Sequence, residues 1–170
     1  MKINPLIYRE YDIRGMVDKD LTPEIVRRLG QGFGTHMAQS GCKDLVVGRD
    51  GRLSSPSYAE ALIEGLISTG CNIVYIGVCP TPVYYFSIFH LNKEGGMMVT
   101  GSHNPPEFNG FKVSVGKSTI FGEEIQQLGR LIEKGKFVTG KGKVSDIEII
   151  RPYQDYIKKN IKLEKKVRVV

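Results

Sequence analysis

The sequence is poor in the residues that metal sites and disulfide frameworks require. It has no tryptophan, three cysteines and three histidines among 170 residues. The cysteines form no CxxC pair and the histidines lie far from them in the sequence, whereas a structural zinc site normally takes four such ligands in paired spacing. An odd number of cysteines also argues against a disulfide framework, so we expect three reduced and mostly buried thiols.

Long apolar runs and a secretion signal are also absent. No run approaches the roughly 20 residues of a membrane-spanning helix. Residues 1–5 do not contain the apolar stretch of a signal peptide. We therefore expect a cytoplasmic protein without a membrane partner.

The formal net charge of +6 permits nucleic acid, a membrane surface or a small anion as a partner. The densest basic stretch, residues 158–168, contains no aromatic side chain that could stack on bases. We interpret it as a solvated helix face and linker, and expect no nucleic-acid partner.

Strand and helix signals alternate along the chain. Residues 22–24 have the start signals of a helix: a capping hydroxyl, a proline and an acid. Apolar residues then recur at every fourth position as far as Met37. We predict further helices from residue 55, through residues 86–89 and over residues 122–134, and buried strands at residues 45–48, 72–77, 95–100 and 111–115.

This alternation predicts a three-layer α/β/α domain with a mixed, mostly parallel sheet of about four strands. Only about ten residues join the strand at 95–100 to the strand at 111–115, which is too few for a crossover helix. We therefore expect these two strands to form an antiparallel pair.

The composition changes after residue 135. Residues 135–146 are rich in glycine and lysine and predict a loop or hairpin, residues 151–162 predict a helix, and residues 165–170 the start of a strand. We interpret residues 1–150 as one α/β domain and residues 151–170 as a linker helix and the first strand of a truncated second domain. A single domain whose last strand ends the chain remains an alternative.

The segment TGSHNPP, residues 100–106, directly follows a predicted buried strand. A polar loop in this position is where α/β folds bind ligands. Gly101 lets the backbone bend and a large group approach, the prolines stiffen the exit, and His103 and Asn104 supply donors. A rigid Ser102 among donors suits a nucleophile or phosphate carrier, although a tight turn with local hydrogen bonds explains the same residues.

Two cationic residues favour the functional interpretation. Lys112 lies in the strand that is predicted to pair back toward the loop, which brings its amine within reach of Ser102. Arg14, in YREYDIRG, precedes a glycine, and a guanidinium binds phosphate through two parallel hydrogen bonds. Taken alone, the Arg14 segment is also explained as a strand end with a surface salt bridge.

Three ordered motifs together resemble the first domain of the alpha-D-phosphohexomutase family. They are YDIRG (residues 11–15), VGRDGRLSSP (47–56) and TGSHNPPEFNGFKV (100–113). The sequence is more similar to the bacterial and archaeal phosphomannomutase/phosphoglucomutase branch than to the phosphoglucosamine mutase branch. The first motif of the latter usually has a Thr-Asp-Gly core, where this sequence has Tyr11-Asp12-Ile13.

The resemblance implies an isomerase that interconverts hexose 1-phosphate and hexose 6-phosphate, with mannose or glucose as the sugar. Transfer would proceed through a phosphoserine and a bisphosphorylated sugar intermediate. Ser102 would carry the phosphoryl group, Tyr11 would border the sugar, and residues 1–150 would be the phosphoserine-bearing domain I.

The same resemblance implies catalytic roles for four residues around this serine. Arg14 and Lys112 would flank the phosphate and bind substrate, and Lys112 would transfer a proton or neutralise charge. His103 and Asn104 would shape the loop and donate hydrogen bonds to phosphate oxygens.

The resemblance also implies a Mg²⁺ ion that contacts Ser102 through its phosphate, with the bisphosphorylated hexose as activator. Magnesium prefers six oxygen ligands, and near Ser102 the sequence offers Glu107. The family takes its other metal, sugar and distal phosphate contacts from further domains. Because one electrostatic donor contributes about 3 kcal/mol and phosphate-ester chemistry can demand more than about 20 kcal/mol, we expect this chain alone to be inactive. Its partners would be a hexose phosphate and the remaining domains of the enzyme.

Other functions remain open at this point. A module that binds a sugar phosphate without turnover has the same loop, and a phosphoglucosamine mutase domain has similar motifs. A basic nucleic-acid-binding domain is a third class, which would show strongly salt-dependent binding to duplex DNA.

Overall fold

The structure is a computed structural model that describes residues 3–162, 164–165 and 168. Within these residues the centre of the fold is a seven-stranded sheet with the order β1-β5-β4-β2-β3-β7, and β6 pairs with β5. The strands are β1 (Ile13–Met16), β2 (Asp44–Arg49), β3 (Asn72–Val78), β4 (Gly95–Val99), β5 (Phe108–Val115), β6 (Ser118–Thr119) and β7 (Val144–Asp146).

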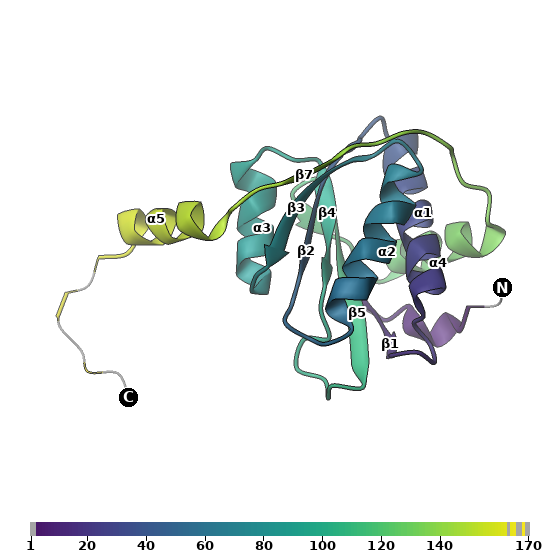
Figure 1. The fold of residues 1–170 in the computed structure, drawn as a ribbon, viewed down its shortest axis with the longest axis horizontal. Helices are drawn as coiled ribbons and strands as arrows, with labels where there is room; N and C mark the ends of the chain where they lie inside the picture. Colours follow the sequence, from purple (N-terminus) through teal and green to yellow (C-terminus); the bar gives the residue numbers. More distant parts are fainter. Residues whose placement is uncertain (1–2, 163, 166–167, 169–170) are drawn as a thin grey trace.

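Helices cover both faces of this sheet (Figure 1). They are η1 (Pro5–Ile7), α1 (Pro23–Gln39), α2 (Ser55–Ile67), α3 (Thr81–His90), α4 (Glu123–Lys134) and α5 (Ile150–Asn160). Helices α1, α2 and α4 share one apolar core with the sheet, whereas α3 packs on the opposite face in a second, smaller core. The predicted three-layer α/β/α architecture is confirmed.

The strands of the sheet alternate their side chains between the two cores. Val47 and Val99 belong to the core under α1 and α2, whereas Val46 and Met98 belong to the core under α3. Successive residues of a strand point to opposite faces, so strands buried on both sides need continuous apolar runs. This requirement explains why the sequence of β2 and β4 predicts them clearly.

The sheet is mixed, as predicted, because in the described residues β5 is antiparallel to every strand with which it pairs. It is antiparallel to β1, β4 and β6, whereas β2 is parallel to both β3 and β4, and β7 is parallel to β3. The antiparallel pair expected from the short connection is therefore confirmed as β4 and β5. Because β5 lies between β1 and β4, it connects the N-terminal segment to the centre of the sheet.

The predicted number of about four strands is wrong, because short strands extend the sheet. Strand β7 lies in the segment predicted as a loop or hairpin, and its side chains are exposed throughout. It is held by backbone hydrogen bonds to β3, including one from the Ile73 N–H to the Lys143 carbonyl at 2.7 Å. An exposed strand of three residues has no apolar pattern, so its sequence could not predict it.

The predicted start of α1 and the predicted end of α4 are both found. The Thr22 hydroxyl accepts a hydrogen bond from the Ile25 N–H at 3.3 Å, which caps α1. Helix α4 ends at Lys134, and Gly135 follows with a φ of 65°. This left-handed conformation is the common helix stop, which glycine adopts without a steric penalty.

The C-terminal helix α5 matches the helix predicted at residues 151–162. It has no buried residue, and it meets α3 through ring contacts of Phe86 with Tyr153 and Tyr156, each with centroids 5.2 Å apart. The strand predicted at residues 165–170 lies largely outside the described residues, and the domain boundary at residue 150 stays a prediction. No described helix has both the length and the apolar character to cross a membrane.

Candidate active site

The loops after β2 and β4 meet at one edge of the sheet. The two strands are parallel neighbours, with Arg49 paired to Val99, and the Asp50 N–H donates to the Val99 carbonyl at 2.9 Å. Their carboxyl ends therefore lie side by side, which is the position where open α/β sheets bind ligands. The serine loop, residues 100–107, begins here.

Ser102 stands exposed in this loop in an unusual backbone conformation. Its φ is 54°, and its N–H donates to the Thr100 hydroxyl at 2.9 Å. The Asn104 N–H donates to the Gly101 carbonyl at 3.1 Å, which closes a tight turn around the serine. A left-handed residue other than glycine costs roughly 1–3 kcal/mol and persists only where its surroundings fix it.

Arg52, in the connection between β2 and α2, supplies much of this fixation. Its guanidinium donates to the carbonyls of Pro105 at 2.7 Å and Phe108 at 3.0 Å. It also donates to the carbonyls of Ser102 at 3.2 Å and Asn104 at 2.6 Å. The side chain thus binds four backbone carbonyls of the serine loop and its exit.

Gly101 makes room for that guanidinium. A Cβ atom at residue 101 would lie 2.4 Å from the Arg52 Cζ atom. The sequence predicts that a large group approaches Gly101 closely. In the structure that group is the Arg52 side chain of the same chain.

Asp50 joins the two loops below the serine. One carboxylate oxygen accepts from the Gly101 N–H at 3.1 Å, and the other accepts from the Ser55 hydroxyl at 2.5 Å. Burial of Asp50 raises its pKa. The two hydrogen bonds, together with others from Thr100 and the Arg52 N–H, lower the pKa by more than burial raises it, so the pKa lies below its usual value. Asp50 is therefore held as a carboxylate.

A pocket of about 570 Å³ lies beside the serine loop. Charged, aromatic and amide side chains line it, from the N-terminal segment and from the loop and strand around β5: Arg9, Glu10, Tyr11, Asp12, Arg14, Asn104, Phe108 and Lys112. The pocket therefore combines cationic donors, which suit a phosphate, with aromatic surfaces.

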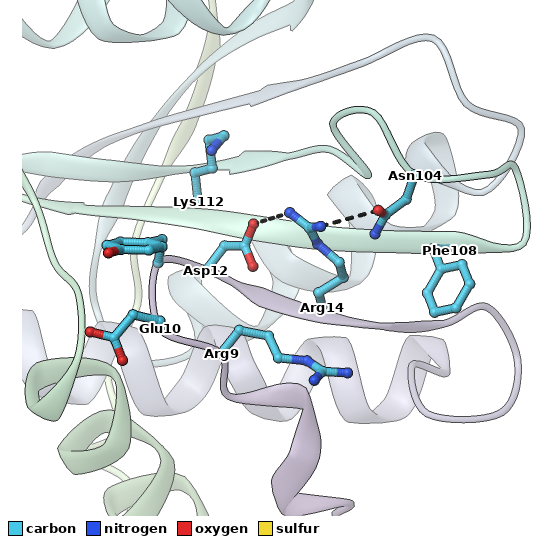
Figure 2. A pocket seen from close by; sticks show the side chains of 8 residues that line it. Arg9, Glu10, Asp12, Arg14, Asn104, Phe108 and Lys112 are labelled. Carbon is cyan, nitrogen blue, oxygen red and sulfur yellow. Dashed lines mark hydrogen bonds and ion pairs between the residues drawn. The ribbon is translucent and has the colours of Figure 1, made fainter.

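The register of β1 and β5 brings Arg14 and Lys112 to this pocket. Arg14 pairs with Gly110, and Lys112 lies two residues further along β5 and hence on the same face. Figure 2 shows Arg14 between Asp12 and Asn104. Its guanidinium is paired with the Asp12 carboxylate and donates to the Asn104 side-chain oxygen at 3.2 Å.

The structure brings four of the six predicted site residues into the pocket wall. These are Tyr11, Arg14, Asn104 and Lys112. Ser102 and His103 are exposed in the same loop but are not among the residues that line the pocket. The approach of the Ser102 hydroxyl to Arg14 and Lys112 therefore stays a prediction.

Sequence reasoning did not assign roles to several residues of the site. Asp50 and Arg52 lie in the VGRDGRLSSP motif, which gave the only signal that could have found them. Arg9 and Glu10 precede the YDIRG motif, Phe108 lies within the TGSHNPPEFNGFKV motif, and all three line the pocket. They are missed because a charged or aromatic residue in or beside a motif is equally typical of a solvated surface.

The described residues do not offer a ligand set for a metal ion. No group of three or more His, Cys, Asp or Glu side chains gathers in this part of the chain. Asp18 and Asp20 are close in sequence, but Asp20 accepts hydrogen bonds from the Met16 N–H at 3.0 Å and from Asn4 at 2.9 Å. The residues present therefore do not fit a magnesium site by themselves.

Comparison with known proteins places this arrangement in a family. The family model of phosphoglucomutase/phosphomannomutase, alpha/beta/alpha domain I, matches residues 5–139. A phosphomannomutase/phosphoglucomutase from Pseudomonas aeruginosa is 42% identical over 164 residues, which cover 96% of this chain and 35% of that protein. A phosphoglucomutase from Neisseria gonorrhoeae is 38% identical over 165 residues, covering 96% and 36%.

Solved structures show the same fold. A phosphoglucomutase/phosphomannomutase family protein from Burkholderia thailandensis superposes with a TM-score of 0.92 at 37% identity, covering 96% of this chain and 38% of that one. A protein described as a putative phosphomannomutase from Thermus thermophilus gives a TM-score of 0.84 at 28% identity. The chain thus spans little more than a third of the length of these relatives, and it belongs to the phosphoglucomutase/phosphomannomutase family, of which it carries the alpha/beta/alpha domain I.

Proposed function

We propose that this chain is the phosphoserine-bearing domain of a magnesium-dependent phosphohexomutase that interconverts the 1-phosphates and 6-phosphates of mannose and glucose. The names of the relatives support the reaction class. The observation that carries the proposal is an exposed Ser102 on a braced loop next to a pocket lined by Arg14 and Lys112. Because the chain spans about a third of its relatives, turnover would need the remaining domains.

In the proposed reaction, phosphorylated Ser102 donates its phosphoryl group to a free hydroxyl of the hexose phosphate. The bond from phosphorus to the serine oxygen breaks, and a bond to the sugar oxygen forms. The serine oxygen takes up a proton, for which the Lys112 ammonium is our candidate donor, and the amine so formed takes the proton of the sugar hydroxyl. The bisphosphorylated sugar then reorients, and its other phosphate returns to Ser102.

The pocket supplies the charge that this transfer needs. A phosphoserine carries about −1.5 to −2 charges at neutral pH, so a second phosphate approaches it only where cations neutralise both. Phosphoryl transfer depends mainly on positioning and charge stabilisation, which Arg14 and Lys112 would provide. The described residues do not form a magnesium site, and the ligands of the ion would come from the remaining domains.

The proposal is tested by fusing this chain to the remaining domains of the Pseudomonas aeruginosa relative and measuring conversion of glucose 1-phosphate to glucose 6-phosphate. We expect an active fusion, in which Ser102→Ala reduces turnover to background and the exposed serine variant Ser57→Ala does not. Intact mass should show one added phosphoryl group that is absent in Ser102→Ala.

The outcome also distinguishes the binding-module alternative. A module without turnover predicts that the fusion is inactive while the chain alone binds glucose 1-phosphate tightly in calorimetry. Full activity of the Ser102→Ala fusion would contradict the proposed function directly.

A further inference from the structure

We infer that Arg52 is the positioning residue that holds Ser102 in its exposed, left-handed conformation. The structural part of this inference depends only on the geometry of the loop. Its consequence for phosphoryl transfer rests on the proposed function.

The hydrogen-bonding capacity of Arg52 is fully used inside the protein. A guanidinium has five N–H donors in a fixed plane. One terminal nitrogen donates to the Pro105 and Phe108 carbonyls, and the other to the Ser102 and Asn104 carbonyls. The remaining nitrogen, Nε, lies 3.3 Å from a carboxylate oxygen of Asp50. No N–H group is left for a substrate or a phosphate, so Arg52 acts on the loop.

Arg14 shows the contrasting case at the same site. Its two terminal nitrogens contact Asp12 and Asn104, and its buried Nε atom has no hydrogen-bond partner among the described residues. Arg14 also lines the pocket, whereas Arg52 is not among the lining residues. Arg14 and Arg52 therefore have different roles: Arg14 is open to an anion in the pocket, whereas Arg52 is bound to the backbone of the loop.

The acceptors of Arg52 explain why one side chain can define the loop. Its four carbonyl partners belong to residues between Ser102 and Phe108, so they face inward onto one plane. The hydrogen bonds to the Asn104 and Phe108 carbonyls are partly buried, and carbonyls in such positions need partners. Without the guanidinium, the segment has to turn these groups toward water, and the Ser102 conformation loses its support.

The base of the assembly is fixed from the other side by Asp50. This carboxylate contacts the Arg52 Nε atom and accepts from the Gly101 N–H. Asn109 at the loop exit donates to the hydroxyls of Ser54 at 2.8 Å and Ser55 at 3.0 Å. Arg52 is therefore itself held in place and can transmit the rigidity of α2 and β2 to the serine loop.

Lysine is a sharp test of this role because it retains the charge but not the plane. An ammonium has three donors on a single atom and cannot reproduce the fork. Arg52→Lys should therefore release the loop while leaving the net charge unchanged. Arg27→Lys is the matched control, because Arg27 is exposed on α1 and its ion pair with Glu64 is long at 3.9 Å.

The first measurement is amide hydrogen exchange on the unphosphorylated full chain. In Arg52→Lys we expect the amides of Gly101, Ser102 and Asn104 to exchange at least about tenfold faster than in the wild type, with little change in the centre of β4. Arg27→Lys should match the wild type throughout. Unchanged loop protection in a folded Arg52→Lys chain would overturn the inference.

A second variant keeps the test decisive if Arg52→Lys does not fold. Gly101→Ala places a methyl group where the guanidinium lies and should displace Arg52 without removing it. If Arg52 acts through the loop, Gly101→Ala and Arg52→Lys disturb the same contact, and their effects on loop exchange are not additive. Additive effects, or a Gly101→Ala loop as protected as the wild type, would argue against the role.

The second measurement uses the active fusion and separates positioning from binding. We expect Arg52→Lys to lower kcat by about 100-fold, because a small misplacement of a reacting group has effects of this size. KM should change little, since the pocket residues remain. A large rise in KM with unchanged kcat would contradict a positioning role. An inactive wild-type fusion would refute the proposed function, and the exchange experiment would still decide the role of Arg52.

Discussion

At the scale of single residues, the site depends on a few polar side chains that bind backbone atoms. Asp50 is the clearest example, because it accepts from the Gly101 N–H of one loop and from the Ser55 hydroxyl at the start of α2. Ser55 therefore serves the loop, and the N-cap of α2, Ser54, makes no side-chain capping bond. Ser55, at the serine–proline start of α2, therefore helps to hold Asp50 under the serine loop in addition to beginning the helix.

The lowered pKa of Asp50 makes a prediction about acid stability. Because the pKa is lower in the native state than in the unfolded chain, the carboxylate stabilises the fold above the usual Asp value near 3.8, and this contribution is lost as the pH falls through the native pKa. Asp50→Asn should therefore destabilise the chain at pH 7, by about 1–3 kcal/mol for unmade hydrogen bonds. The difference in free energy of unfolding between Asp50→Asn and the wild type should become smaller as the pH falls below the usual Asp pKa.

Urea unfolding at a series of pH values measures this effect. Asp155→Asn is the control, since Asp155 is exposed on α5 and among the described residues pairs only with Arg151, one helical turn away. Its variant should follow the wild type at every pH. If the difference in free energy of unfolding between Asp50→Asn and the wild type stayed constant from neutral to acid pH, the electrostatic explanation would be contradicted.

Among site residues, those that the sequence could predict are the ones that act through side-chain chemistry. Arg14, Asn104 and Lys112 belong to motifs whose residue types suit a phosphate, and all three line the pocket. Arg52 was missed because its partners are four main-chain carbonyls, which are present at every residue and leave no pattern. Only the folded loop shows which carbonyls converge.

At the scale of elements, α1 and α2 are packed through glycines. A Cβ atom on Gly30 of α1 would lie 2.5 Å from the Leu62 carbonyl oxygen, and one on Gly65 of α2 would lie 2.1 Å from the Arg27 carbonyl oxygen. The two glycines therefore allow close approach of the helix backbones from both sides. This contact fixes α2, which follows directly after Arg52.

Gly65→Ala separates helix propensity from packing. Alanine is favoured over glycine in a helix by about 1 kcal/mol, but here its methyl group meets backbone atoms that cannot rotate away, and overpacking typically costs about 1–3 kcal/mol. We expect net destabilisation of up to about 2 kcal/mol, seen as a lower urea midpoint.

The matched control for this substitution is Gly51→Ala. Among the described residues, no atom lies within 4 Å of the position that a Cβ atom on Gly51 would take, and its φ is not positive. Its variant should therefore stay within about 0.5 kcal/mol of the wild type. A Gly65→Ala chain as stable as the wild type would mean that the helices separate without loss.

The elements that could be predicted are those with local signals. Helix α1 has its cap, its proline and an apolar stripe, and β2 and β4 are apolar on both faces. Strand β7 forms only through pairing with the distant strand β3. The two-residue strand β6 forms a tight hairpin with the end of β5, and neither short sequence has a period. The sequence therefore predicts the α/β/α order of the layers correctly but underestimates the number of strands.

At the scale of the whole molecule, the folded unit extends beyond the segment that the family model matches. That match ends at residue 139, but β7 continues the sheet at Val144–Asp146 beside β3. Ile149 is buried in the core under α3, with 1% of its surface exposed. Helix α5, which follows at once, contributes no buried residue, and Figure 1 shows it beside α3 at one end of the molecule.

Two shortened chains test where the domain ends. A chain ending at Ile149 loses the ring contacts of α5 with Phe86, so we expect a loss of about 1–3 kcal/mol from two aromatic pairs. A chain ending at residue 139 also loses burial of Ile149, worth about 1.5–3 kcal/mol, and uncovers the edge of β3, which invites pairing between chains. The longer form should therefore remain folded and monomeric, whereas the shorter form should unfold at lower urea and associate in size-exclusion chromatography. Equal stability of the two would place the boundary at residue 139 and refute the predicted division at residue 150.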